Sequence, residues 1–151
     1  MRVGFIQNNP VFGKIESNLS KIETLFSYDN TDLMVLPELF NTGYHFLNRE
    51  EVLTLSESVP EGPTTQALIR ICKKKKTSII AGIAERDGDQ VYNSAVIVGT
   101  KGYLGKYRKI HLFDTEKNYF NRGALPLRVF DIGLARVGVM ICFDWRFPES
   151  A

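Results

Sequence analysis

Apolar residues follow two different spacings along the first half of the chain. Residues 2–7 and 33–36 are short apolar runs bounded by turn-forming residues, which is typical of strands. Between them, apolar residues recur every three or four positions over residues 14–28, which is the period of one helix face. The same period, preceded by a proline, predicts a second helix over residues 64–75, while residues 40–61 are predicted to be a loop with short helical turns.

Apolar runs separated by glycine-containing turns follow one another in the second half. They predict strands over residues 78–85, 91–99, 103–107, 127–132 and 135–142. Helices that alternate with strands, followed by hairpins, predict an α/β fold of the layered α+β kind, with a mixed sheet and helices over one face. The other face of so apolar a sheet also needs a cover, and no further helix is predicted within residues 1–151.

The composition is that of one ordinary globular domain. The 151 residues are 44% hydrophobic and 24% charged, which excludes wholesale disorder. The net charge of +2 is too small to favour nucleic acid as a partner, and the four lysines at 73–76 end a predicted helix, where cations are favoured. No apolar stretch approaches the roughly 18 residues that span a membrane, and no secretory segment opens the chain. We therefore expect a cytoplasmic protein with free thiols.

Three side chains that could take part in catalysis lie at the ends of predicted strands. Glu38 follows the strand at 33–36, Lys109 follows the strand at 103–107, and Cys142 ends the last strand. Alone, each has an ordinary interpretation as a surface charge or, for the cysteine, as a small core residue. Because ligand sites of open α/β sheets lie beyond the carboxyl ends of strands, the three side chains are predicted to converge on one crevice.

Cys142 has the surroundings of a nucleophile. A sharp turn and a helix beginning near Phe147–Pro148 would lift its thiol clear of the sheet, and the positive end of that helix would lower the pKa of the thiol. Histidine is the usual partner of a catalytic cysteine, but His45 lies in an undistinguished loop and His111 fits a structural role, although a Cys–His–Asn arrangement stays open. No metal-ligand spacing and no glycine-rich phosphate motif is present, so no cofactor is expected.

Three segments resemble the signature blocks of the nitrilase superfamily, the carbon–nitrogen hydrolases. They are LPELFNTGY, KYRKIHLF and GVMICFDWRFPES, which align without gaps around Glu38, Lys109 and Cys142. The resemblance implies that these residues form a Glu–Lys–Cys triad, with Glu116 as a supporting acid. It also implies an αββα sandwich, a homodimer or higher homo-oligomer, and a single domain over residues 1–151 that is truncated after the nucleophile turn, so that about half of the sandwich is present.

The same resemblance implies a mechanism. Cys142 would attack the carbonyl carbon of a small amide and form a thioester, and Glu38 would move the protons. Lys109 would hold the oxyanion together with the backbone N–H of Phe143. Glu116 would position Lys109 and keep it charged.

The residues around this triad have two interpretations each. Tyr44, Phe143 and Trp145 are expected to line the acyl pocket, but plain packing roles stay open for all three. Asp144 and Arg146 are expected to anchor the turn by hydrogen bonds. Two alternative functions also stay open: hydrolysis of a nitrile or an N-carbamoyl group by the same triad, or a non-catalytic role as a fragment or an assembly subunit.

Overall fold

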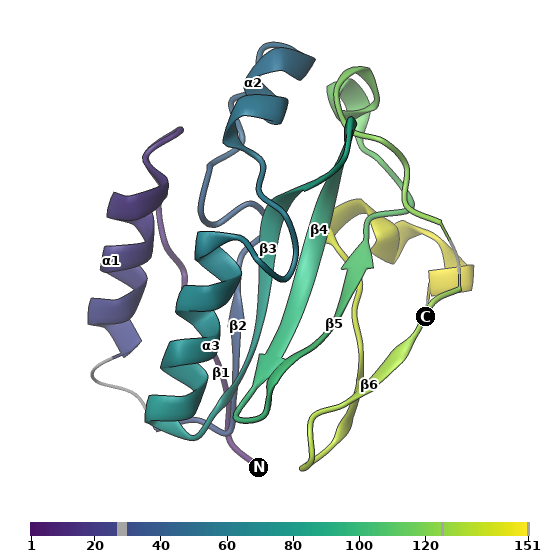
Figure 1. Ribbon diagram of the computed structural model, residues 1–151. Helices are drawn as coiled ribbons and strands as arrows, with labels where there is room; N and C mark the ends of the chain where they lie inside the picture. Colours follow the sequence, from purple (N-terminus) through teal and green to yellow (C-terminus); the bar gives the residue numbers. More distant parts are fainter. Residues whose placement is uncertain (27–29, 125, 151) are drawn as a thin grey trace.

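A five-stranded mixed sheet forms the centre of the molecule (Figure 1). The computed structural model describes residues 1–26, 30–124 and 126–150. The strands lie across the sheet in sequence order: β1 (Val3–Phe5), β2 (Leu33–Leu36), β3 (Ser78–Asp87), β4 (Gln90–Gly99) and β5 (Gly102–Arg108). Strands β1, β2 and β3 are parallel, whereas β4 and β5 extend the sheet by antiparallel pairing. The predicted mixed sheet is confirmed.

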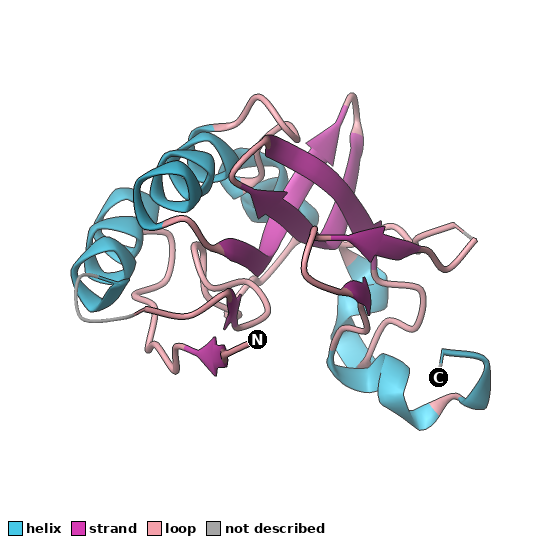
Figure 2. Cartoon of the chain, turned by 90° about the horizontal axis from the view of Figure 1, so that it is seen from below, coloured by secondary structure: helices cyan, strands magenta, loops and turns pink. Residues whose placement is uncertain are grey.

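Two helices, α1 (Ile15–Phe26) and α3 (Pro63–Lys75), cover one face of this sheet (Figures 1 and 2). Each helix turns its apolar stripe inward. Ile22 of α1 and Leu68 of α3 are fully buried in a core that also contains Met34 of β2. Burial of such stripes stabilises helices of this length more than their intrinsic propensity does.

The boundaries of the helices agree closely with the periodicity of the sequence. The helix predicted over residues 14–28 begins at Ile15, and its last two predicted residues, 27 and 28, lie outside the described residues. In the loop predicted over residues 40–61, a short helix α2 (Arg49–Leu55) forms, and the side-chain oxygen of Asn48 caps it by accepting a hydrogen bond from the Glu51 backbone N–H. None of the helices in the described part of the chain has the length and apolarity that a membrane span requires.

A two-stranded hairpin lies on the opposite side of the sheet from α1 and α3 (Figure 1). It consists of β6 (Val129–Asp131) and β7 (Arg136–Gly138). Phe130 of this hairpin joins Ile97 of β4 and Ile141 in a second apolar core. The sheet therefore has an apolar core on each face.

Both hairpin strands are shorter than the predicted ranges 127–132 and 135–142, so the prediction that the last strand ends on Cys142 is wrong. Beyond the last β6–β7 pair, Val129 with Gly138, the Ile141 N–H donates to Asp144 Oδ2 at 3.0 Å instead of to a β-ladder, and side-chain bonds of this kind compete with strand pairing. The chain leaves the hairpin at Gly138 and enters a 3₁₀ turn, η2 (Cys142–Arg146). Cys142 therefore opens a turn instead of closing a strand.

Candidate active site

The carboxyl ends of β2 and β5 bring Glu38 and Lys109 together. Strand β5 runs in the same direction as β2 because two antiparallel pairings separate it from β3. The Lys109 Nζ lies 2.7 Å from Glu38 Oε1 and 2.7 Å from Glu116 Oε2. Glu116 comes from a 3₁₀ turn, η1 (Asp114–Asn118), that follows β5. Three of the residues singled out in the sequence thus meet in one ion cluster.

Lys109 is a buried ammonium group between two carboxylates. Its side chain is only 1% exposed. Burial by itself lowers the pKa of Lys109, but the hydrogen bonds to Glu116 and Glu38 and the charges of both carboxylates outweigh burial and raise the pKa. Lys109 is therefore held in its charged form at neutral pH.

Both oxygens of the Glu38 carboxylate accept hydrogen bonds. Oε1 accepts from Lys109 Nζ and, at 2.6 Å, from Nδ2 of Asn93. Oε2 accepts from the hydroxyl group of Tyr44. Burial, followed by the hydrogen bond to Glu38 and the charge of Glu38, raises the pKa of Tyr44, so the phenol keeps its proton and acts as a donor.

Cys142 lies beside Glu38 at the start of η2. Its φ of 43° is in the left-handed region, a backbone conformation that few residues other than glycine adopt. Partial burial of the thiol raises the pKa of Cys142, as do the charge of Glu38 and a hydrogen bond to Glu38, while the charge of Lys109 acts in the opposite direction. The thiol of Cys142 is therefore predominantly protonated at neutral pH, and a base beside it has a proton to remove.

The expected pKa of Cys142 needs correction. The prediction was a lowered pKa, caused by a helix that begins near Phe147. The described residues form only two short 3₁₀ turns there, η2 and η3 (Pro148–Ser150), and burial of the thiol, followed by the charge of Glu38, acts on the pKa in the opposite direction. Burial and a nearby negative charge both disfavour the thiolate, so the pKa is raised instead.

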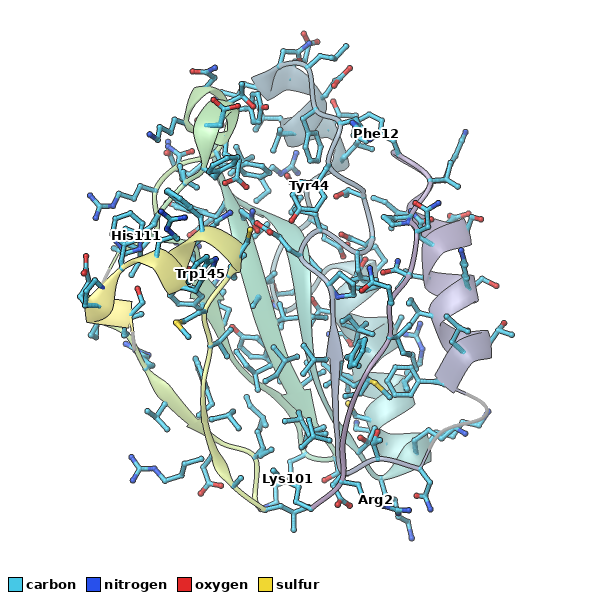
Figure 3. All side chains as sticks on the ribbon, turned by 180° about the vertical axis from the view of Figure 1, so that it is seen from behind. Arg2, Phe12, Tyr44, Lys101, His111 and Trp145 are labelled. Carbon is cyan, nitrogen blue, oxygen red and sulfur yellow. The ribbon has the colours of Figure 1, made fainter. Side chains whose placement is uncertain are left out.

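These groups line a cavity of about 170 Å³. It is lined by the cluster residues Glu38, Lys109 and Glu116, by Cys142, and by a mostly aromatic wall comprising Leu39, Tyr44, Phe46, Phe113, Asp114, Thr115, Tyr119 and Phe120. Of the three residues expected to line an acyl pocket, Tyr44 is at this cavity. Its position on the loop after β2 is visible in Figure 3.

The other two expected pocket residues lie elsewhere. The ring of Phe143 packs against Phe113 and Phe147, with ring centroids 5.0 Å and 5.3 Å apart, and Phe143 lines a neighbouring cavity of about 500 Å³. The side chain of Trp145 is 68% exposed, with the guanidinium group of Arg146 over its ring (Figure 3). The 170 Å³ cavity therefore does not include Phe143 or Trp145.

Asp144 fixes the turn that carries Cys142. Its Oδ2 accepts hydrogen bonds from the Tyr107 hydroxyl at 2.8 Å and from the Ile141 N–H at 3.0 Å. Its Oδ1 accepts from the backbone N–H of His111 at 3.0 Å and lies 2.8 Å from Nδ1 of the same residue. The imidazole of His111 thus supports the turn through Asp144, which fits the structural role predicted for it.

Glycine at position 82 allows the backbone of Glu38 to lie against β3. A Cβ atom at Gly82 would be 2.4 Å from the Cα of Glu38 and 2.8 Å from the carbonyl oxygen of Pro37. The backbone carbonyl of Gly82 also accepts a hydrogen bond from the Phe40 N–H at 3.0 Å. A side chain at position 82 would therefore push the backbone of Glu38 away from β3.

Sequence reasoning missed Asn93, which contacts both carboxylates of the cluster. The sequence feature that could have indicated it is the Asn-Ser pair inside the otherwise apolar segment 91–99, where polar residues are unexpected in a buried strand.

The described residues contain no group of three or more His, Cys, Asp or Glu side chains arranged to hold a metal ion.

Comparisons with known proteins identify the family and the fold of the chain. A family model described as carbon-nitrogen hydrolase matches residues 2–151. A protein of Pyrococcus abyssi (strain GE5 / Orsay) named nitrilase is 52% identical over 154 residues, which cover 100% of this chain and 59% of the relative. A crystal structure of an N-terminal amidase superposes with a TM-score of 0.79 at 29% identity and covers 85% of this chain and 32% of its own.

The fold is also found in a more distant structure. A CN-hydrolase superfamily protein from Xanthomonas campestris gives a TM-score of 0.85 at 22% identity, covering 97% of this chain and 55% of that one. The chain thus spans 59% of the nitrilase and 32% and 55% of the two solved chains. With its match to the family model over residues 2–151, the chain belongs to the carbon-nitrogen hydrolase family.

Proposed function

We propose that the intact protein hydrolyses a carbon–nitrogen bond of a small amide through a thioester on Cys142. One observation carries this proposal: a thiol, a carboxylate and a buried ammonium group, those of Cys142, Glu38 and Lys109, line the same small cavity. An amide carbonyl is a weak electrophile, and covalent catalysis divides its hydrolysis into two easier steps. The family membership supports the same reaction class.

In the first step, Glu38 removes the proton of the Cys142 thiol as Sγ attacks the carbonyl carbon. The raised pKa of the thiol makes this base necessary. The tetrahedral oxyanion is stabilised by the ammonium group of Lys109 and the backbone N–H of Phe143. The C–N bond then breaks, Glu38 gives its proton to the leaving nitrogen, and ammonia or an amine departs from the thioester.

In the second step, Glu38 removes a proton from water as its oxygen attacks the thioester carbon. The same two donors, the Lys109 ammonium group and the Phe143 N–H, stabilise the new oxyanion. When the C–S bond breaks, the sulfur of Cys142 takes back the proton from Glu38 and the carboxylic acid leaves. Glu116, 2.7 Å from the Lys109 Nζ, keeps the ammonium group in place throughout.

Nitrile hydrolysis is the second candidate, because the 52% identical relative is named nitrilase. The same thiol would add to the nitrile carbon and form a thioimidate. One water would displace the nitrogen as ammonia and leave a thioester, and a second water would release the carboxylic acid and restore the thiol. N-carbamoyl groups also fit a thiol and base of this kind. The cavity of about 170 Å³ favours a small acyl group in each case.

The first test is to trap the acyl group on Cys142. The intact protein is incubated with a panel of small aliphatic and aromatic amides and nitriles, and ammonia release and the masses of the cysteine peptides are measured. We expect ammonia release and an acyl adduct on Cys142 that hydroxylamine removes. Cys72 is the internal control, because burial raises its pKa to about 12 and it should stay unmodified.

Two results would contradict the proposal. One is ammonia release that continues unchanged after Cys142 has been fully alkylated, which would exclude the thioester. The other is a folded protein that releases no ammonia from any amide, nitrile or carbamoyl compound, which would favour a binding role. Ammonia from nitriles but not from amides would reassign the substrate class while leaving the nucleophile unchanged.

Replacing Gly82 with alanine is expected to displace Glu38. A methyl group 2.4 Å from the Cα of Glu38 forces the backbone apart, and a displacement near 1 Å can lower a rate about 100-fold. Overpacking of this kind also lowers the free energy of unfolding by about 1–3 kcal/mol. Ammonia release and denaturant unfolding measure the two effects. The control is Gly138→Ala, because nothing lies within 4 Å of a Cβ at Gly138; equal behaviour of the two variants would contradict the prediction.

A further inference from the structure

Asn93 lies between the two carboxylates that hold Lys109. Its side chain, on β4, is fully buried. Its Nδ2 donates to Glu38 Oε1 at 2.6 Å and to Glu116 Oε1 at 2.8 Å. Since Lys109 Nζ contacts the same two carboxylates at 2.7 Å each, the four side chains form a closed ring of alternating donors and acceptors.

The backbone of Asn93 also locates the lysine. The N–H of Lys109 donates to the carbonyl oxygen of Asn93 at 2.8 Å, directly beyond the last β4–β5 pair. One residue of β4 therefore fixes the main chain of Lys109 and both carboxylates that contact its ammonium group. Such double anchoring holds reacting groups close to a single geometry.

An uncharged hydrogen-bond donor suits position 93 better than a charged one. Glu38 and Glu116 carry two negative charges against one positive charge on Lys109, so the cluster has an excess of negative charge. A second lysine or an arginine at position 93 would remove that excess and weaken Glu38 as a base. The amide of Asn93 donates two hydrogen bonds to carboxylates without adding charge.

The orientation of the Asn93 amide leaves its oxygen without a hydrogen-bond donor, which lowers the stability of the fold. Within the described part of the chain, no donor reaches Oδ1 of Asn93, although this oxygen is buried. The reverse orientation would place Oδ1 against the carboxylate oxygens of Glu38 and Glu116. An unpaired buried acceptor lowers stability, and retaining one beside a candidate active site indicates a functional role.

We propose that Asn93 is a positioning residue that holds the carboxylates of Glu38 and Glu116 on Lys109 and orients Glu38 for its work as a base. Its catalytic consequence rests on the proposed function. Without the amide, both carboxylates lose a donor that favours their ionised form, so they take up protons at a higher pH than in the unaltered protein.

The test compares Asn93→Ala, Asn93→Asp and Ser94→Ala in the intact protein. Ser94 is the matched control, because it is the next residue of β4, is also fully buried, and donates one hydrogen bond to Glu85 Oε2 at 2.5 Å, away from the ring. The pH at which the carboxyl carbons of Glu38 and Glu116 change chemical shift is followed by NMR after ¹³C-glutamate labelling. The pH dependence of kcat and of KM for ammonia release is measured in parallel.

For Asn93→Ala, we expect both carboxyl titrations and the acidic limb of kcat to move to higher pH, with KM little changed. Asn93→Asp keeps the shape of the side chain and adds a third carboxylate, so the upward movement should be larger. Ser94→Ala should leave the titrations of Glu38 and Glu116 where they are. If Asn93→Ala does not fold, Asn93→Asp decides the result.

Coincident titrations in the unaltered protein and in the folded Asn93 variants would overturn this role, even if those variants were less stable. A failure of the proposed function looks different. The unaltered protein would then release no ammonia, while the carboxyl titrations of the Asn93 variants would still move.

Discussion

Replacing Cys142 with alanine is expected to abolish hydrolysis and leave the fold intact. Loss of a hydrolase nucleophile lowers kcat by about 10⁶-fold, because no other side chain can form the covalent intermediate. Alanine keeps the Cβ atom on the same backbone, and Cys142 is an exposed residue, so the free energy of unfolding should change by less than about 0.5 kcal/mol. Ammonia release and denaturant unfolding measure the two quantities.

The control is Cys72→Ala. Cys72 belongs to α3 and its side chain is fully buried in the core, so its truncation leaves a cavity and should lower stability while turnover is kept. The two cysteine variants should therefore show opposite effects on rate and stability. Turnover by Cys142→Ala within tenfold of the unaltered protein would exclude the thioester mechanism.

Replacing Lys109 with methionine is expected to lower both stability and activity. The substitution leaves Glu38 and Glu116 facing each other without a cation, and breaking a buried ion pair in this way costs about 3–5 kcal/mol. Removing an oxyanion donor lowers kcat by a further about 10²–10³-fold in the fraction that folds. Denaturant unfolding and ammonia release at a temperature where the variant is folded test both parts.

The pH dependence of this variant separates charge from packing. Protonation of either carboxyl group removes the repulsion, so the loss of stability should be smaller at pH 5 than at pH 8. A pure packing defect would be the same at both values. Lys101→Met, at an exposed position between β4 and β5, should have little effect on either measurement; equal stability of the two lysine variants would contradict the importance of the cluster.

The sequence predicts most of the sheet and the meeting of Glu38 with Lys109. Strand direction explains this success, because the carboxyl ends of β2 and β5 reach the same edge of the sheet whatever the details of the loops. The apolar periodicity likewise places α1 and α3 within one or two residues, since each buries a continuous stripe.

What the sequence could not predict depends on contacts across the sheet. The role of Asn93 follows from its position opposite Glu38 and Glu116, 55 and 23 residues away along the chain. The direction of the pKa shift at Cys142 depends on burial of the thiol and on the charges of Glu38 and Lys109, which no local pattern reveals. The early end of β7 goes with a contact between Ile141 and Asp144, in which the side chain of Asp144 accepts the backbone N–H that a longer strand would use.

The left-handed backbone at Cys142 places activity and stability in competition at a single position. A residue with a Cβ atom at a φ of 43° carries strain of about 1–2 kcal/mol that glycine would not carry. Selection for stability alone would therefore favour glycine, which has no thiol, at position 142. A cysteine kept in this conformation indicates that the position is governed by what its sulfur does.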